Sequence, residues 1–240
     1  MLQELCRRLG IDASGGQIPE LRAALDALPP GHPLAALLRT APDFQDDAAL
    51  ADALLHPQDR AYSVPQLFDF LKAGGCSFVR WLRQAPYSAR CGVLARLPQS
   101  GRLTALPPDE QYAAAELYRG TMVRHTAIVA RDDERQTGPV SFAGDAWRGY
   151  VPIRLPDTVA VRERIPPGVA AVLINRAHTD TDLYLPIDAR GERLYEAIDG
   201  ARTIGEITRE AGDQAAAWFE RLYWHDQVAL DTSRAAQTRA

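Results

Sequence analysis

The sequence predicts an α+β fold, made of helical segments, a few strands and a small winged-helix-like domain near the C-terminus. Three observations support this class. Apolar residues recur at helical spacing through the segments before residue 74. Apolar and β-branched runs at 77–84 and 125–131 are typical of strands. The region 189–230 then reads as helix, helix, helix and strand, which is the order of a winged helix.

The composition is that of an ordinary globular protein and excludes some partners. With 240 residues, 46% of them hydrophobic and 24% charged, the chain can bury one good core or two small ones. The formal net charge of -4 provides no basic surface for nucleic acid or an anionic membrane. Cys6, Cys76 and Cys91 are widely spaced, which argues against a disulfide framework or a structural zinc site. No segment reads as a signal peptide or reaches the ~20 apolar residues of a membrane helix, so we expect a cytoplasmic protein.

The first 55 residues are predicted to be helical. Their four expected helices are short and loosely patterned, as suits a helical insertion lying over a sheet; they are Met1–Leu9, Ile18–Leu28, Pro33–Thr40 and Asp43–Leu55. Asp43 and Asp46 are both candidate N-caps of the fourth helix. The residues Pro29, Pro30 and Gly31 end the second helix.

The stretch from Leu54 to Phe78 combines a polar loop, a helix and the start of a strand. Ser63 is a plausible N-cap, and Pro65 stands just inside the helix, where its missing N–H costs nothing. Gly74 and Gly75 end the helix. The preceding loop concentrates a histidine, an acid, an arginine and a phenol within a few residues.

Two strands are expected to follow, at Ser77–Gln84 and His125–Arg131, with a helix over Gln111–Gly120 between them. Ala114, Leu117 and Tyr118 would form the inward face of that helix. Nothing else on the chain is predicted to pair with the two strands except each other. Unpaired strand edges favour association, so we expect a partner to cover them.

The last third of the chain differs in pattern. We expect residues 1–133 to form one domain, 134–149 a linker, 150–233 a winged-helix-like accessory domain and 234–240 a tail. Thr203 and Glu206 fit a capping box at the start of the second of its helices. The expected elements are strands at Tyr150–Leu155, Thr158–Val161, Gly168–Asn175 and 182–187, helices at Ala189–Ile198, Thr203–Ala211 and Asp213–His225, and a final strand at 228–230.

The stretch at residues 55–81 resembles a segment of class I S-adenosylmethionine-dependent methyltransferases, in the subgroup with an LHPxDRAYxVPxLFxFL pattern. The matching residues are Leu55, His56, Pro57, Asp59, Arg60, Ala61, Tyr62, Val64, Pro65, Leu67, Phe68, Phe70, Leu71, Phe78 and Trp81. The resemblance extends back to Met1 and forward to about residue 133, and the segment at 185–207 resembles winged-helix-like modules appended to such enzymes. The resemblance implies that the strands expected at Ser77–Gln84 and His125–Arg131 are the last strands of a methyltransferase-like sheet.

One departure from this family governs the functional expectation. Such enzymes bind their cofactor in an N-terminal Rossmann-like half, and this sequence has no glycine-rich loop after a strand that could serve it. The resemblance therefore leads us to expect that Met1 is an internal methionine, of a mis-called start or of a gene that lost its 5′ half. The alternative is a genuine short protein that opens with a helix.

The polar loop supplies the candidate site residues. A histidine near an acid could deprotonate a nucleophile, and an arginine with a tyrosine could hold a carboxylate or phosphate. We expect His56, Asp59, Arg60 and Tyr62 to contact substrate in an intact enzyme. Without a cofactor pocket, the simpler interpretation is that Asp59 and Arg60 brace the loop while His56 and Tyr62 pack with prolines. His125 reads as a buried or edge histidine, and His178, near Asp180 and Asp182, as part of a hairpin turn more than of a cation site. We expect no catalytic, cofactor-binding or metal-ligating residue on this chain.

Three functions remain open from the sequence. The first is the C-terminal, substrate-side and regulatory portion of a methyltransferase, inactive alone, which would use S-adenosylmethionine only when a cofactor-binding half completes it. The second is a non-catalytic regulatory subunit of a partner methyltransferase. The third and weakest is a winged-helix nucleic-acid binder, because the expected recognition helix 213–225 carries Arg221 against Asp213 and Glu220. Expected partners are a methyltransferase N-terminal half or a second copy of the chain, and neither a membrane nor nucleic acid.

Overall fold

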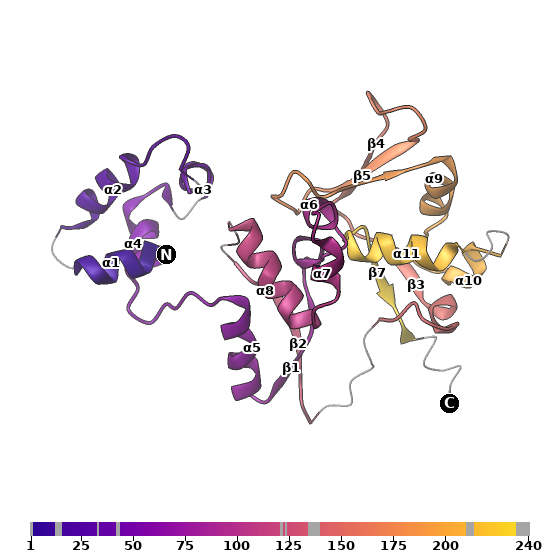
Figure 1. The fold of residues 1–240 in the computed structure, drawn as a ribbon, viewed down its shortest axis with the longest axis horizontal. Helices are drawn as coiled ribbons and strands as arrows, with labels where there is room; N and C mark the ends of the chain where they lie inside the picture. Colours follow the sequence, from indigo (N-terminus) through magenta and orange to yellow (C-terminus); the bar gives the residue numbers. More distant parts are fainter. Residues whose placement is uncertain are drawn as a thin grey trace.

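The computed structural model describes residues 2–12, 16–32, 34–41, 44–120, 122, 124–133, 140–209 and 214–233 (Figure 1). With about 43% helix and 15% strand in small antiparallel sheets, the fold is α+β, as predicted. Met1, the candidate cap Asp43, part of the expected linker and the expected tail lie outside the described residues. Three groups of elements follow one another along the chain, and we call them the N-terminal helices, the central unit and the C-terminal unit.

The N-terminal helices form a small group of their own, at the left of Figure 1. They are α1 (Leu2–Leu9), α2 (Ile18–Asp26), α3 (Ala35–Thr40) and α4 (Asp47–Leu55). Asp46 caps α4, because its side chain accepts a hydrogen bond from the backbone N–H of Ala49. Cys6, Leu21 and Leu50 are buried at the centre of the group.

The central unit is built around a two-stranded antiparallel sheet. Its elements are α5 (Val64–Ala73), β1 (Cys76–Trp81), the short 3-10 helix η2 (Ala85–Tyr87), α6 (Gly92–Ala95), α7 (Ser100–Thr104), α8 (Pro108–Arg119) and β2 (Ala127–Arg131). Strands β1 and β2 pair with a register shift between Phe78 and Arg80. Within the described residues the two strands pair with no other strand, as the sequence predicted. Aromatic side chains fill the space between β1 and α8, and the ring of Trp81 stacks on that of Tyr87 at 4.0 Å.

The predicted inward face of α8 is wrong for Leu117 and Tyr118, although Ala114 is half-buried. Leu117 is 82% exposed and Tyr118 is 52% exposed, whereas Ala115 is fully buried. Helix α8 carries several alanines in a row and therefore offers two weakly apolar faces to the rest of the unit. The face that turns inward is the one whose Tyr112 ring meets Phe78 and Trp81. Periodicity alone could not choose between the two faces.

In the described residues of the C-terminal unit, two small sheets pack with three α-helices and one 3-10 helix. Its elements are the 3-10 helix η3 (Ala146–Gly149), β3 (Val151–Arg154), β4 (Thr158–Val161), β5 (Ala171–Asn175), β6 (Tyr184–Ile187), α9 (Ala189–Glu196), α10 (Ile204–Ile207), α11 (Ala215–Trp224) and β7 (Val228–Asp231). The sheet orders are β4-β5-β6 and β3-β7, all antiparallel. Thr203 and Glu206 form the expected capping box at α10. The core of the unit centres on Leu173, Phe219 and Leu222, which are fully buried.

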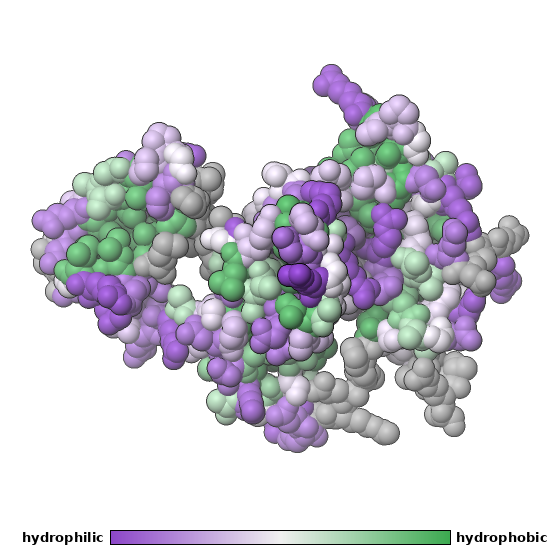
Figure 2. Space-filling view, viewed as in Figure 1, coloured by the Kyte–Doolittle hydropathy of each residue, from purple (hydrophilic) through white to green (hydrophobic). Residues whose placement is uncertain are grey.

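Hydrophobic surface is visible on the N-terminal helices in the space-filling view (Figure 2). Leu5 and Leu9 of α1 are 45% and 64% exposed. In the part of the chain that the structure describes, no helix is both long and apolar enough to span a membrane.

Candidate functional site

The polar loop connects α4 to α5, and its backbone is folded by local hydrogen bonds. His56 caps the C-terminus of α4 and leaves the helix in an extended conformation. Its Nδ1 accepts a hydrogen bond from the backbone N–H of Gln58 at 3.3 Å, and its carbonyl oxygen accepts one from the N–H of Asp59 at 3.2 Å. The imidazole therefore takes part in a tight turn, which the Pro57 that follows it favours.

The four predicted site residues make contacts in different directions. The Asp59 carboxylate accepts a hydrogen bond from Gln3 Nε2 of α1 at 3.4 Å. The Arg60 guanidinium lies over the Tyr62 ring, 5.0 Å from its centroid, and the Tyr62 ring contacts Phe70 of α5 at 5.4 Å. The structure thus divides the predicted cluster into two parts: Asp59 is attached to α1, and Arg60 with Tyr62 is attached to α5.

Part of the loop borders a hollow of about 680 Å³ between α1 and the end of α4. The hollow is lined by Gln3, Glu4, Cys6, Arg7, Ile11, Asp12, Leu54, Leu55, His56, Pro57, Asp59, Arg60 and Ala61. Its volume is within the range of small-molecule sites. Hydrogen bonds from Arg7 and Arg8 lower the pKa of Glu4, so this carboxylate stays ionised at the rim. The exposed, mixed-charge lining suits binding by ion pairs and hydrogen bonds.

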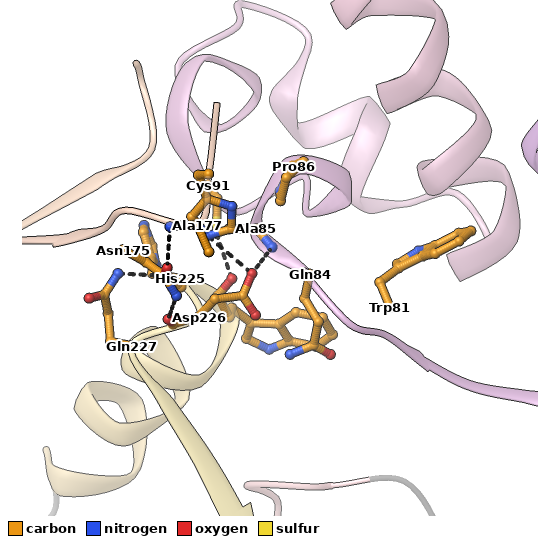
Figure 3. A network of polar contacts seen from close by, with 12 residues as sticks. Trp81, Gln84, Ala85, Pro86, Cys91, Asn175, Ala177, His225, Asp226 and Gln227 are labelled. Atoms are coloured by element: carbon orange, nitrogen blue, oxygen red, sulfur yellow. Dashed lines mark hydrogen bonds and ion pairs between the residues drawn. The ribbon is translucent and has the colours of Figure 1, made fainter. Parts of the chain in front are cut away.

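A second polar region, which the sequence did not predict, joins the central and C-terminal units, and Figure 3 shows the part of it around Asp226. We call it the seam, and its principal residues are Arg80, Ala85, Val93, Arg119, His178, Asp180, Asp182 and Asp226. Asp226 follows α11 in the left-handed conformation, with φ 51, and its side chain is 1% exposed. Its Oδ2 accepts a hydrogen bond from the backbone N–H of Ala85 at 2.8 Å and lies 3.3 Å from His178 Nε2. Asp226 Oδ1 lies 3.7 Å from the Arg80 guanidinium.

The second part of the seam is centred on Arg119 at the end of α8. Its side chain is 4% exposed and forms ion pairs of 3.1 Å with both Asp180 and Asp182 of the β5–β6 connection. Asp182 Oδ2 also accepts a hydrogen bond from the N–H of Val93 at 2.6 Å. Burial opposes ionisation of Asp182, but the hydrogen bonds from Arg119 and Val93 outweigh it and lower its pKa. Gly92 has φ +56, and a Cβ there would collide with this carboxylate.

The remaining buried titratable groups of the central unit stabilise its structure. Burial raises the pKa of the Cys91 thiol to about 12, and its Sγ donates a hydrogen bond to the Trp224 carbonyl oxygen, so Cys91 is a neutral thiol rather than a nucleophile. His125, predicted to be a buried or edge histidine, has a side chain that is 9% exposed. Its Nδ1 lies 2.7 Å from the Tyr87 hydroxyl and its Nε2 lies 3.1 Å from Glu116 Oε1. Burial raises the pKa of Tyr87 well above its ordinary value.

The histidine and acids at 178–182 lie in the β5–β6 connection, in agreement with the predicted hairpin turn. His178 is directed to Asp226, and both acids bind Arg119. Among the described residues, no three His, Cys, Asp or Glu side chains gather in a way that could hold a metal ion. The sequence offered one signal for the seam, which is an aspartate directly after a helix C-terminus, where aspartate tolerates a positive φ. It offered none for the partners of that aspartate.

No protein-family model matches the sequence.

Proposed function

We propose that this chain is the C-terminal, substrate-side and regulatory portion of a class I S-adenosylmethionine-dependent methyltransferase, inactive alone. The observation that carries the proposal is the placement of the family-like loop. His56, Asp59 and Arg60 all border a hollow of about 680 Å³, although their own contacts point in different directions, and all three residues are exposed. Exposed polar groups around a hollow of this size can bind a substrate.

The regulatory part of the proposal rests on the seam. Asp182 and Asp226 of the C-terminal unit each accept a hydrogen bond from a backbone N–H at the start of a short helix in the central unit, at Val93 and Ala85. Such charge-assisted bonds are directional and therefore fix one unit against the other. A change in the C-terminal unit would be transmitted through η2 and α6 to the aromatic core beneath β1.

Isothermal titration with S-adenosylhomocysteine tests the proposal. Three samples are compared: the chain alone, the product of an adjacent gene that encodes a Rossmann-like half, and the mixture of both. We expect no heat of binding from the chain alone and, for the mixture, tighter binding than for the Rossmann-like half alone. Micromolar binding by the chain alone would contradict the proposal, because it would require a cofactor site on this chain.

The loop is tested in the same reconstituted pair with labelled S-adenosylmethionine. Arg60→Ala should lower methyl transfer at least about tenfold, the effect of losing one charge-assisted contact of ~1.4 kcal/mol or more, without changing cofactor affinity. Arg102→Ala, an exposed substitution on α7, is the matched control and should transfer methyl groups at the unaltered rate. Equal activity of the two variants would remove the loop from the substrate site.

A non-catalytic regulatory subunit is the second candidate, and exposed apolar surface favours it. Val79, Ile128 and Val129 on the β1–β2 sheet are 40–44% exposed, and each strand has one edge without a partner strand in the described part of the chain. A stable complex with a catalytically complete methyltransferase, measured by light scattering after size exclusion, would support this function. If that partner also transfers methyl groups in the absence of this chain, the chain is a regulatory subunit and not the substrate-side portion of the enzyme.

Nucleic-acid binding stays the weakest proposal. Helix α11 contributes Glu220 to an ion pair with Arg90 of the central unit, so part of its surface already faces protein. A salt-sensitive gel shift of duplex DNA by the chain would support this function, and the absence of any shift at low salt would exclude it.

A further inference from the structure

A second hollow, of about 430 Å³, lies in the C-terminal unit where β6 ends and where α9 and α11 begin. It is lined by Pro186, Ile187, Asp188, Arg190, Gly191, Leu194, Gln214, Ala215, Ala217, Trp218 and Arg221. None of these residues belongs to the loop or to the seam. The volume is sufficient for a small organic molecule.

One side of this hollow is apolar and partly flat. The half-buried indole of Trp218 lies against the first turn of α9, and a Cβ at Gly191 would approach Trp218 Nε1 to 2.7 Å. Glycine within a helix costs ~0.5–1 kcal/mol relative to alanine, so this close approach is made at the expense of helix stability. Ile187 and Leu194 add aliphatic surface on the side of β6 and α9.

The charges of the described lining residues favour an anion. Arg190 and Arg221 are the two cations, and Asp188 is the single acid. The Asp188 carboxylate is already engaged, because its Oδ1 accepts a hydrogen bond from the N–H of Gly191 at 2.7 Å. Guanidinium groups bind carboxylate and phosphate oxygens in a planar, bidentate manner. The start of α11 adds the positive end of a helix dipole to the same region, whereas the start of α9 is already capped by the Asp188 carboxylate.

We propose that this hollow is a binding site for a small organic anion with a flat apolar body and one carboxylate or phosphate group. The apolar body lies against Trp218 and Leu194, and the anionic group pairs with Arg221. The proposal is independent of the methyltransferase assignment, because it uses neither the loop nor a cofactor.

The test uses the full chain and 2-naphthoate as the probe, measured by isothermal titration and by saturation-transfer NMR. We expect a dissociation constant below about 1 mM, and binding at least about fivefold weaker for the neutral analogue 2-naphthalenemethanol. Arg221→Gln should weaken naphthoate binding at least about fivefold, because it removes the exposed cation without disturbing the core. Arg193→Gln, on α9 but outside the hollow, is the control and should bind as tightly as the unaltered chain.

Two results would overturn the proposal. One is the absence of binding at about 5 mM naphthoate, and the other is equal affinity of the Arg221→Gln and Arg193→Gln variants. Gly191→Ala is a second test, because the added methyl group should displace the Trp218 indole and abolish probe binding. The far-ultraviolet circular dichroism of this variant should stay unchanged. If this variant does not fold, the naphthoate affinities of the two arginine variants still test the proposal.

Discussion

The Asp226 carboxylate accepts a hydrogen bond from the backbone N–H of Ala85 at 2.8 Å, although 141 positions separate the two residues. This bond places a buried carboxyl group at the start of η2, where the free N–H groups of a helix favour an acceptor. It is the point at which the C-terminal unit fixes the start of the turn that carries Tyr87, and therefore the aromatic core of the central unit.

Replacement of Asp226 should lower the free energy of unfolding in proportion to the interactions that the new side chain cannot make. Asp226→Ala leaves the Ala85 N–H and the Arg80 guanidinium without this partner and should lower the free energy of unfolding by about 3–5 kcal/mol. Asp226→Asn retains an acceptor and the tolerance for positive φ, so a loss of only about 1–2 kcal/mol is expected. Urea unfolding followed by circular dichroism measures both. Equal losses in the two variants would show that the charge, rather than the acceptor, dominates.

The ionised Asp182 should make the stability of the protein depend on acid pH. Its pKa in the folded protein is below the ordinary value of 3.8, so its contribution is fully present above that value and is lost as the pH falls through the folded-state pKa. Asp182→Asn should cost about 1–3 kcal/mol at pH 7, and the difference from the unaltered protein should shrink below about pH 4. Unfolding free energies measured from pH 7 to the acid limit test this. A difference that is independent of pH would contradict the ionised ion pair.

Glu116 holds two elements of the central unit together. Its Oε2 accepts a hydrogen bond from the N–H of Val64 at the start of α5, and its Oε1 contacts His125 before β2. Glu116→Ala should therefore lower the free energy of unfolding by about 2–3 kcal/mol, since the Val64 N–H is left without its acceptor. Glu110→Ala on the exposed face of α8 is the control and should change it by less than about 0.5 kcal/mol.

The two faces of α8 can be distinguished by paired substitutions. Ala115→Val adds volume at a fully buried position and should destabilise by about 1–3 kcal/mol. Leu117→Ala removes a side chain that is 82% exposed and should change stability by less than about 0.5 kcal/mol. Thermal unfolding of both variants measures the contrast. A larger loss for Leu117→Ala would mean that a partner covers this face.

The sequence by itself determined where several helices begin and end. Asp46 caps α4, Ser63 and Pro65 begin α5, Gly74 ends it, and Thr203 with Glu206 begins α10. These signals act within four residues of one another, because caps and turns satisfy the nearest free backbone groups. The positions of most helices and strands followed from them, with strand β1 ending at Trp81 rather than at the predicted Gln84.

Only the tertiary structure decided how the polar side chains are used. The predicted cluster at 56–62 separates because Asp59 bonds to α1 and Tyr62 packs on α5. The seam joins Arg119 to Asp182 and Ala85 to Asp226 across 63 and 141 positions. A carboxylate has the same local pattern whether it faces water or a distant backbone N–H. Its partner is fixed only when separate elements pack together, and for that reason no spacing in the sequence could have identified it.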